Sequence, residues 1–551
     1  MPVGGGPPWP PQTCDAGKLG DCNLGQPRRV APTSQLEKGN MLQHHRDAIV
    51  IGAGISGLVC AYRLKALGVD VTLIEKSERA GGVIQTDRID GYLIERGPNS
   101  SQGSEELLAL VEELGITGEL IEGDPKAPAY VYFNGALHPV PSGAGAFMKS
   151  HLLSLRGKLR IFKEPFVPVR RSESEESVAS FARRRIGREA AERMVAPFVS
   201  GIYAGDAEQL SVQAAFPKLA NLETGYGGLF RGMLAKGREA RRAKRNASAV
   251  LEKAAPARKR LCSFRSGMAF LPNTLASKLG EDLMTGCEEL RIGDCGLRIE
   301  ETFQASPGNP QSAIRNPQSN LGQASPGNPQ SAIRNPQSNL FTVEFEHAGD
   351  RHQLTCERLI VATPAGVASS LVAPLSEELS RLLGEIDYPP LAIISLAYDG
   401  SAIATKLDGF GFLVPPSERM NILGCVWNSS LFDGRAPGGK ALVTVFIGGA
   451  RNPTAAQAAD AELVSTAHGE LSKVLGISGD PQVVAITRYQ RSIPQYNLGH
   501  FARVRRIETL LGDSSGLSLI GNYLHGVSTG DCIKDADRVA REVATSMSGT
   551  S

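Results

Sequence analysis

The sequence predicts an α/β protein with more than one domain, and three observations carry this prediction. A strand, a glycine-rich turn, a helix and a second strand follow one another between residues 47 and 75. Four strand-like runs separated by turns lie between residues 388 and 450, as is typical of a sheet in a second domain. The stretch from 172 to 260 is rich in helix-forming residues. At 551 residues the chain is long enough for two or three domains.

The first unit has the form of a Rossmann-like nucleotide-binding motif. Residues 48–51 are an apolar run of strand type. The turn that follows consists of Gly52, Ala53, Gly54, Ile55, Ser56 and Gly57. The first glycine permits a tight turn, the second lets the backbone approach a pyrophosphate, and the third lets the helix pack close to the strand. We expect the helix at 56–67 to direct its free N–H groups at phosphates.

An acidic residue ends the second predicted strand. Residues 69–74 are strand-like, and Glu75 follows them, with Lys76 beside it in the candidate site. A carboxylate roughly 20 residues after the glycines accepts hydrogen bonds from ribose hydroxyls. An ordinary βαβ unit without a nucleotide is the alternative, but the complete context favours nucleotide binding.

A second glycine pair indicates that the nucleotide is FAD. Arg79 precedes Gly81 and Gly82, and this pattern resembles the extension found in FAD enzymes of the amine oxidase, phytoene desaturase and protoporphyrinogen oxidase group. Adjacent glycines let the backbone pass close to the flavin side of the cofactor, and the arginine can pair with phosphate or support the loop. An NAD-only dehydrogenase has no need of this stretch, so we expect FAD rather than NAD.

A third tight turn consists of Gly97, Pro98, Asn99 and Ser100. In the group that the sequence resembles, this turn lies beside the flavin ring. Asn99 is therefore the one candidate for a polar side chain that faces the reacting carbon, and we assign no catalytic acid or base. The alternative is that Asn99 only holds the turn.

The C-terminal region supplies a further candidate contact with the cofactor. Residues 358–363 are expected to form a strand that returns to the nucleotide-binding sheet, and residues 517–521 to form another. Val527, Ser528 and Thr529 then open a helix predicted around residues 531–545. A helix N-terminus there suits the flavin ring carbonyl or a phosphate, although an ordinary strand–loop–helix connection has the same pattern.

Composition excludes several classes of function. Lys plus Arg number 59 and Asp plus Glu number 57, so we expect no nucleic-acid partner. The nine cysteines include no CxxC pair and the nine histidines show no ligand spacing, which argues against a disulfide framework and a metal site. No apolar run approaches ~20 residues, and the first 40 residues have no signal-peptide core. We therefore expect a cytoplasmic protein with buried thiols.

Two segments are expected to be disordered. Residues 1–46 are rich in Pro, Gly and polar residues, and the segment 304–321 recurs unchanged at 323–340. Neither has enough apolar residues to fold alone. Strands predicted at 290–301 and 341–347 flank the repeat, so we interpret it as a duplicated insertion in a loop between neighbouring strands. A binding tail is the alternative.

The stretch 231–260 is strongly basic. It holds eleven Lys or Arg against two Glu. A solvated, partly mobile helix or loop is the simpler interpretation, since no aromatic or leucine face accompanies the charge. The more specific interpretation is peripheral contact with an anionic membrane or with a partner protein. Upstream, a helix is predicted at 177–186, with residues 172–176 offering an N-cap and first-turn acids.

Further segments match one branch of the flavin enzymes in the family's own order. They are residues 195–206, 210–218, 263–267, 410–415, 422–427, 432–437, 493–496, 499–500 and 521–528. From about residue 47 to 545 the sequence resembles the bacterial-type FAD-dependent protoporphyrinogen/coproporphyrinogen oxidase family, within the flavin amine oxidase superfamily. The resemblance implies a three-layer FAD-binding domain with a parallel sheet, a mixed-sheet substrate domain and a helical subdomain.

The resemblance also divides the chain. It implies an FAD-binding domain built from residues 47–125, 263–303, 341–387 and 498–546. The substrate and helical region, with its possible membrane contact, is placed at 126–262, and the sheet of the substrate domain at 388–497.

The implied activity is the six-electron oxidation of protoporphyrinogen IX, coproporphyrinogen III or both to the porphyrin in haem biosynthesis, by hydride transfer to FAD with dioxygen as acceptor. The pyrrole nitrogens can lose protons as hydride leaves, so no strong side-chain base is required. Another amine oxidase or a carotenoid desaturase is one alternative, although the segments 197–206 and 521–528 are not expected there. A flavoprotein that binds porphyrins without catalysis is the other.

Two positions depart from the family's pattern. Tyr489 stands where the family often has tryptophan beside the cofactor, and it keeps an aromatic surface. Ala129 stands where plant-like enzymes have an arginine that grips a substrate propionate. The plant mode of propionate recognition is therefore not expected here.

Overall fold

The computed structural model describes residues 43–172, 174–246, 260–294, 340–512 and 516–548. Most of the predicted N-terminal tail, the repeat up to residue 339 and the second half of the basic stretch lie outside these residues. The first strand, β1 (Gln43–Ile51), begins ahead of the domain boundary predicted at residue 47, since it pairs with β13 from Gln43 onward.

The nucleotide-binding part is built on a seven-stranded sheet. From one edge its strands are β10 (Leu283–Met284), β2 (Val71–Ile74), β1, β13 (Asp350–Val361), β12 (Phe341–His347) and β11 (Glu288–Asp294), with β19 (Leu517–Leu519) also paired to β13. The strands β10, β2, β1, β13 and β19 are parallel, as predicted. β11, β12 and β13 are antiparallel, and a tight turn at Ala348 and Gly349 joins β12 to β13. The predicted pairing of the strands on either side of the repeat is confirmed.

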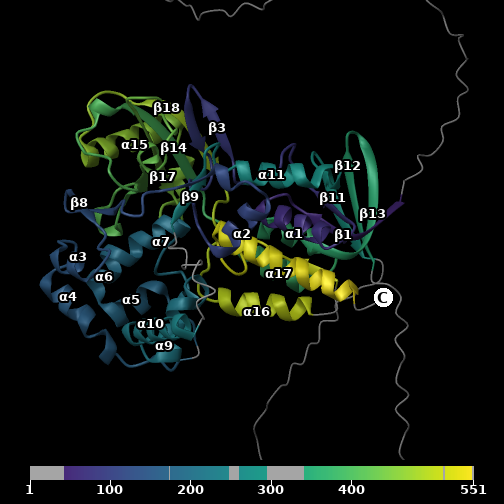
Figure 1. The fold of residues 1–551 in the computed structure, drawn as a ribbon, viewed down its shortest axis with the longest axis horizontal. Coiled ribbons are helices and arrows are strands. Elements are labelled where there is room, and N and C mark those ends of the chain that lie inside the picture. The colour runs from purple at the N-terminus through teal and green to yellow at the C-terminus, as the bar shows by residue number, and fades with distance from the viewer. Residues whose placement is uncertain (1–42, 173, 247–259, 295–339, 513–515, 549–551) are drawn as a thin grey trace, which may run out of the picture. The chain divides into compact units, whose positions relative to one another are not determined.

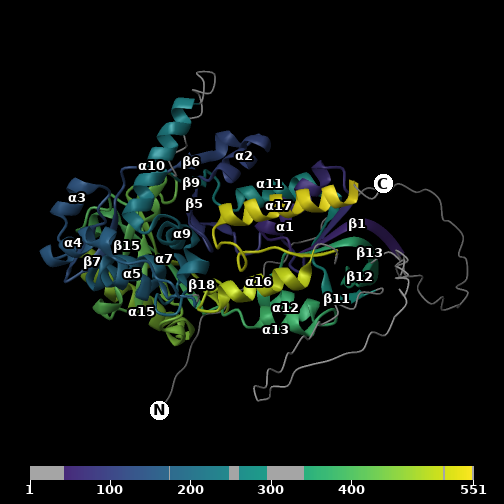
Figure 2. The same ribbon diagram turned by 90° about the horizontal axis from the view of Figure 1, so that it is seen from below.

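Helices cover both faces of this sheet, which confirms the three-layer prediction (Figure 2). One face carries α1 (Ile55–Ala66), α2 (Glu105–Glu113), α11 (Phe270–Leu279) and α17 (Thr529–Ser548). The other carries α12 (Ala365–Val372), α13 (Glu377–Gly384) and α16 (His500–Leu511). Buried aliphatic side chains such as Leu58 and Val539 join α1 to α17, so both ends of the chain's nucleotide-binding part meet on one face.

The second sheet also has seven strands, and it is mixed, as predicted. In order they are β18 (Gln482–Tyr489), β14 (Leu391–Asp399), β17 (Lys440–Gly448), β16 (Ile422–Val426), β15 (Gly411–Leu413), β7 (Ala129–Phe133) and β8 (Ala136–Pro139). Only β15 and β7 are parallel. The helix α15 (Asp460–Leu475) packs on one face through Leu463, Ala467 and Leu471.

Between β8 and residue 246 the described chain is helical (Figure 1). The helices are α3 (Ala144–Lys149), α4 (Leu155–Phe162), η2 (Glu164–Phe166), α5 (Val178–Ile186), α6 (Arg188–Ala190), the π-helix η3 (Ala191–Val195), α7 (Ala196–Tyr203), α8 (Val212–Ala215), α9 (Pro217–Tyr226) and α10 (Leu229–Asn246). The predicted helix at 177–186 is confirmed, but its N-cap is Ser177, whose hydroxyl accepts from the N–H of Ser180. Glu176, expected near the cap, is turned to Arg184 instead.

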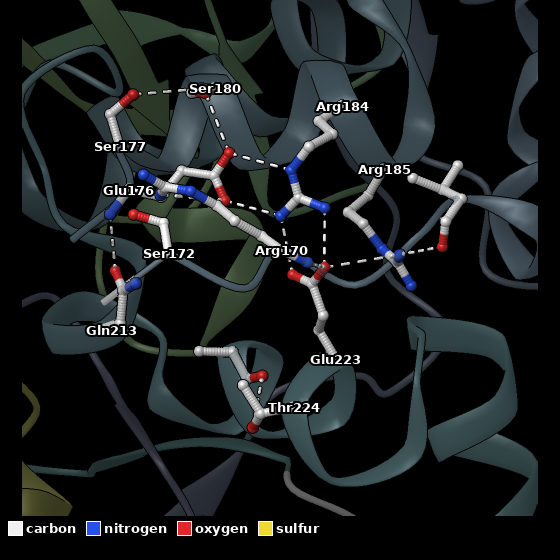
Figure 3. A network of polar contacts seen from close by, with 12 residues as sticks. Arg170, Ser172, Glu176, Ser177, Ser180, Arg184, Arg185, Gln213, Glu223 and Thr224 are labelled. Atoms are coloured by element: carbon white, nitrogen blue, oxygen red, sulfur yellow. Dashed lines mark hydrogen bonds and ion pairs between the residues drawn. The ribbon is translucent and has the colours of Figure 1, made fainter. Parts of the chain in front are cut away.

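A buried ionic network ties these helices together (Figure 3). Arg184, in the last turn of α5, pairs with Glu176 and with Glu223 of α9. Arg185 and its partner Glu164 of η2 are both fully buried. Glu164 also accepts hydrogen bonds from the first N–H groups of α10, so one carboxylate joins η2, α5 and α10.

Short elements complete the described chain. They are β3 (Thr86–Ile89), β4 (Tyr92–Glu95), β5 (Ser101–Gln102), β6 (Leu120–Glu122), β9 (Leu261–Phe264), α14 (Asn428–Leu431), η1 (Thr117–Glu119), η5 (Gly280–Asp282), η6 (Gly400–Ala402), η7 (Pro416–Glu418) and η8 (Pro453–Gln457). The six cysteines in the described part of the chain are buried free thiols, as expected. None of the helices formed by the described residues is long and apolar enough to cross a bilayer.

Candidate active site

The glycine turn between β1 and α1 has the geometry that a dinucleotide requires. Gly52 has a φ of 102°, and its N–H donates to the carbonyl of Ile74 at 2.7 Å. A Cβ at Gly57 would lie 1.9 Å from the carbonyl oxygen of Gly52, so α1 starts pressed against the turn. By contrast, a Cβ at Gly54 would meet nothing within 4 Å. Since no side chain caps α1, its first N–H groups face this open space.

Glu75 lies at the end of β2, where the sequence places it. One carboxylate oxygen accepts from the N–H of Ala53 at 2.7 Å, and the other from the N–H of Ser77 at 2.8 Å. The half-buried Glu75 is therefore held beside the glycine turn, whereas its neighbour Lys76 is exposed. This arrangement suits a carboxylate that receives ribose hydroxyls next to the phosphate-binding turn.

The second glycine pair stacks on the first turn. The N–H of Gly81 donates to the carbonyl of Ala53 at 2.8 Å, and a Cβ at Gly82 would lie 3.2 Å from the Cα of Gly54. Arg79 donates to two carbonyls of its own loop, those of Ala80 and Gly82. Arg79 thus supports the loop, and the glycines keep the surface over Gly54 free of side chains.

The turn at 97–100 is fixed from two sides. A Cβ at Gly97 would lie 2.0 Å from the carbonyl oxygen of Val83, so only glycine fits there. The hydroxyl of Tyr489, at the end of β18, donates to the carbonyl of Arg96 at 3.3 Å. Asn99 accepts a hydrogen bond from Asn428 of α14 at 2.6 Å. The second sheet therefore holds a turn that belongs to the nucleotide-binding part.

The start of α17 also reaches this region. The Cys532 thiol lies in hydrogen-bonding contact with Ser56 of the glycine turn. Ser528 and Asp531 cap the helix reciprocally: the Ser528 hydroxyl donates to the Asp531 carboxylate at 2.6 Å and accepts from the Asp531 N–H at 3.1 Å. The Ser528 side chain is therefore occupied by the cap, and Val527 is partly buried against the helical core. The segment therefore offers a cofactor its backbone rather than the Ser528 side chain.

An apolar face of the second sheet lies next to Tyr489. Leu391 pairs with Tyr489 on one side and with Gly448 on the other, so the ends of β18, β14 and β17 meet. On the face opposite α15, a cluster forms beneath Ala204 at the end of α7; its buried members are Ala204, Leu391 and Ile393, and its half-buried members are Leu423, Phe446, Tyr489 and Ile493. We call this cluster the inner face.

The electrostatics at Tyr489 keep its phenol neutral. Burial raises its pKa, and the guanidinium groups of Arg79 and Arg96 only partly oppose this shift. Tyr489 thus offers a flat ring and a hydrogen-bond donor at the boundary between the inner face and the turn at 97–100.

Sequence reasoning missed three residues of this region. Thr363 follows β13, and its hydroxyl is buried without a partner among the described residues; its methyl group would lie 3.0 Å from a Cβ at Gly52. Asn428 and Thr444 connect the second sheet to Asn99. Only Thr363 had a local signal, since it ends a strand that was expected to return to the sheet.

These observations fit FAD. The open space over Gly54 leaves room for a pyrophosphate, Glu75 lies at the end of β2 where a carboxylate could accept from ribose hydroxyls, and the Thr363 hydroxyl, unpaired among the described residues, could offer a further polar contact beside Gly52. When bound, FAD supplies two-electron redox chemistry, while the protein supplies orientation and an environment shielded from water.

Two hollows on the described surface lie apart from this site. One, of about 770 Å³, is lined by Phe133, Met148, Lys149, His151, Leu155 and Arg193, among others. The other, of about 270 Å³, lies at the end of β15 and β17. Neither is lined by a residue predicted to contact the cofactor. Ala129 is the first residue of β7 in the second sheet and pairs with Gly411 of β15, and it lines neither hollow.

Comparison with known proteins agrees with this geometry. The profile of the flavin containing amine oxidoreductase family matches residues 55–304 and 327–544. Chloroplastic protoporphyrinogen oxidase from Nicotiana tabacum is 32% identical over 534 residues, covering 94% of this chain and 89% of the relative. Coproporphyrinogen III oxidase from Bacillus subtilis (strain 168) is 27% identical over 518 residues, covering 91% and 98%.

Solved structures show the same fold. A candidate protoporphyrinogen oxidase from Exiguobacterium sp. 255-15 superposes with a TM-score of 0.68 at 22% identity, covering 92% of this chain and 100% of that one. Cyclohexylamine oxidase from Brevibacterium oxydans IH-35A gives a TM-score of 0.58 at 14% identity, with coverage of 91% and 99%. The chain belongs to the flavin containing amine oxidoreductase family and, within it, to the group of protoporphyrinogen and coproporphyrinogen oxidases; it is an FAD-dependent oxidoreductase.

Proposed function

We propose that the protein oxidises a porphyrinogen to the porphyrin in haem biosynthesis, with hydride transfer to FAD and dioxygen as the electron acceptor. The observation that carries this proposal is the contact between the inner face and the turn at 97–100, made by Tyr489 and Arg96. It sets an apolar cluster, of which Leu423, Phe446, Tyr489 and Ile493 are only half-buried, beside the position that the family gives to the flavin. A flat, largely apolar macrocycle suits such a surface better than a small amine does.

The electron count defines the reaction. Conversion of a porphyrinogen to a porphyrin removes six electrons and six protons, and FAD takes two electrons at a time. Three cycles are therefore needed, and three molecules of dioxygen accept the electrons as three of hydrogen peroxide. As a meso carbon loses hydride, a pyrrole nitrogen can lose a proton, so the side chains bind and orient the substrate rather than act as a strong base.

The residues proposed to hold FAD come from three segments. They are Gly52, Ala53, Gly54, Ile55, Ser56, Gly57, Glu75, Lys76, Arg79, Gly81 and Gly82 in the first, Gly97, Pro98, Asn99 and Ser100 in the second, and Tyr489, Val527, Ser528 and Thr529 nearer the C-terminus. The hydrogen bond from Gly81 to Ala53 joins the two glycine turns of the first segment, and the one from Tyr489 to Arg96 ties the last segment to the second. Both bonds support the assignment of these residues to one site.

The choice of porphyrinogen is tested by turnover of FAD-loaded protein on protoporphyrinogen IX and on coproporphyrinogen III, followed by porphyrin fluorescence. Because Ala129 lacks the charge found at that position in plant-like enzymes, we expect the oxidation of neither substrate to depend on it. An Ala129→Arg variant should leave the rate on both substrates within about twofold. Absence of porphyrin formation from both substrates would contradict the proposed function.

We also propose that the protein attaches peripherally to an anionic membrane, or to another enzyme of the haem pathway, through the stretch 231–260. The described part of this stretch lies in α10, where Leu234 is 63% exposed among basic residues. The adjoining η2, joined to α10 by Glu164, exposes Phe166 (83%), and α4, which precedes η2 in the chain, exposes Leu155 (73%). Apolar side chains flanked by Lys and Arg favour an interfacial position.

Flotation with phosphatidylserine-containing vesicles tests this attachment. Leu155→Glu and Phe166→Glu together should reduce the vesicle-bound fraction several-fold, because they place two negative charges at the surface. The matched control is Leu67→Glu, which changes an exposed leucine of the nucleotide-binding part. If the double variant bound vesicles as well as Leu67→Glu does, membrane attachment through this surface would be contradicted.

A further inference from the structure

Asn428 connects the core of the second sheet to the turn at 97–100. It is the first residue of α14 and only 5% exposed. Its Nδ2 donates to Oδ1 of Asn99 at 2.6 Å, and its Oδ1 accepts from the hydroxyl of Thr444 at 2.8 Å. Thr444 is buried within β17, so its hydroxyl is held in place beside Asn428. We call these three side chains the amide relay.

The amide relay determines which end of the Asn99 side chain faces Asn428. A primary amide has a donor end and an acceptor end. Since Thr444 donates to the oxygen of Asn428, Asn428 presents its NH₂ group to Asn99, and Asn99 presents its oxygen in return. The NH₂ group of Asn99 is then directed away from Asn428. Within the described chain, no residue accepts a hydrogen bond from it.

The surroundings of the relay resist its rearrangement. Trp427, which precedes Asn428, is fully buried, and Asn428 itself begins a short helix packed against β17. On the other side of the same turn, Tyr489 donates to the carbonyl of Arg96. The strand β18 and the helix α14, which packs against β17, thus hold the turn at 97–100 and position Asn99 relative to the inner face.

We propose that Asn428 is a positioning residue for the oxidation: it holds Asn99 with its NH₂ group facing the space between flavin and substrate. This inference rests on the proposed function, which assigns the turn at 97–100 to the flavin side of the site. Hydride transfer would place negative charge on bound FAD, and a donor on Asn99 that is oriented in advance would stabilise that charge. A reversed amide would direct the oxygen of Asn99 there and oppose it.

The test uses FAD-loaded protein and two readouts. Asn428→Asp has the same shape, but a carboxylate only accepts hydrogen bonds, so the NH₂ group of Asn99 must turn toward it. We expect anaerobic reduction of the flavin by porphyrinogen to slow by about tenfold to a hundredfold. The reduction potential of the substrate-free protein should become more negative, whereas FAD affinity stays within about threefold. Ser430→Ala, on the exposed side of the same helix, is the matched control.

A double-mutant cycle separates positioning from a direct effect of the new charge. In an Asn99→Ala background, Asn428→Asp should cause no further change in potential or rate, since it acts through Asn99. Thr444→Val should shift both readouts in the same direction as Asn428→Asp. Thr444→Ser, which keeps the hydroxyl, should leave both readouts at their wild-type values. The two Thr444 variants carry the test should Asn428→Asp fail to fold.

Two results would overturn the inference. One is an additive cycle, in which Asn428→Asp changes the potential equally with and without Asn99. The other is a potential and a reduction rate that match those of Ser430→Ala in every variant. A wild-type protein that binds FAD but is not reduced by any porphyrinogen would refute the proposed function instead, and the potential measurements would still decide whether the relay orients Asn99.

Discussion

Glu95 and Arg435 lie 3.8 Å apart, carboxylate oxygen to guanidinium nitrogen, and both side chains are 98% or more buried. Glu95 ends β4 just before the turn at 97–100. It also accepts hydrogen bonds from the hydroxyl of Thr86 and the N–H of Met268. Arg435 follows α14 and donates to the hydroxyl of Ser263 in β9. This buried pair joins the candidate flavin side of the site to the second sheet.

The pair makes stability depend on pH near neutrality. Burial raises the pKa of Glu95 from 4.5 to about 7, because the hydrogen bonds and Arg435 only partly offset the loss of water. The folded state favours protonated Glu95. The stabilisation that this carboxyl gives the fold is therefore complete below pH 4.5 and is lost as pH rises through about 7. Glu95→Gln mimics the protonated form. Relative to wild type, its free energy of unfolding should rise by about 3 kcal/mol between pH 4.5 and 8.

Urea denaturation of the FAD-loaded protein at several pH values measures this difference. The exposed Glu112→Gln should show no such pH-dependent gain. A constant difference between wild type and Glu95→Gln from pH 4.5 to 8 would rule out titration of Glu95 in this range.

His500 affects stability in the opposite direction to Glu95: its contribution to the free energy of unfolding decreases as the pH falls. Its ring is 1% exposed and stacks on Tyr496 with 4.2 Å between centroids. Burial, assisted by Arg503 and His525, lowers its pKa from 6.5 to about 4. The folded state favours the neutral ring. The stabilisation that His500 gives the fold is therefore complete above pH 6.5 and is lost as pH falls through about 4. The loss for this group is up to about 3 kcal/mol.

His500→Phe tests this assignment, because phenylalanine keeps a ring for stacking and carries no proton. Thermal unfolding followed by circular dichroism between pH 6.5 and 4 should show a shallower loss of stability for the variant than for wild type. If acidification destabilises both proteins equally, His500 does not titrate in this window.

The fully buried pair of Glu164 and Arg185 stabilises the helical part of the chain. Glu164→Gln leaves the charge of Arg185 without its nearest partner, with Glu223 3.6 Å away as the remaining one. We expect the free energy of unfolding to fall by about 3 kcal/mol, as is usual when one partner of a buried pair is removed. The exposed pair of Arg188 and Glu192 is the control, where Glu192→Gln should cost less than about 1 kcal/mol. Equal effects of the two substitutions in denaturation experiments would contradict this account.

A substitution at Gly54 should weaken cofactor binding without affecting folding. A methyl group there meets no protein atom within 4 Å, so Gly54→Ala should leave the stability of the FAD-free protein within about 1 kcal/mol. The same methyl group occupies the space in front of α1, and FAD affinity should fall at least about tenfold. Gly143→Ala, equally free of contacts, should change neither quantity. Unchanged FAD affinity in a fluorescence titration of Gly54→Ala would exclude this turn as the pyrophosphate site.

The local features of the site could be predicted from the sequence because their chemistry is contained in single segments. The spacing of Gly52, Gly57 and Glu75 within one βαβ unit is enough to place a turn, a helix N-terminus and a carboxylate together. The same holds for the glycine pair at 81–82 and for the strands on either side of the repeat. The N-cap of α5 was predicted within residues 172–176, where several acids and serines are equally suitable. In the structure Glu176 pairs with Arg184 instead, and Ser177 is the N-cap.

Contacts between the two sheets had no signal in the sequence. Asn99 and Asn428 are separated by 329 positions, and each is a single polar residue without a spacing pattern. Glu95 and Arg435 are also far apart in the chain, and a charged residue is usually exposed. Their roles follow from how α14 and β17 pack beside the turn at 97–100, which is decided by tertiary structure alone.

The most direct test of the central claim is anaerobic mixing of the FAD-loaded protein with porphyrinogen in a stopped-flow spectrophotometer. The account predicts bleaching of the flavin absorbance at least as fast as turnover in air, with three flavin equivalents consumed for each porphyrin formed. Porphyrinogen that binds, as shown by equilibrium dialysis, while the flavin stays oxidised would contradict it.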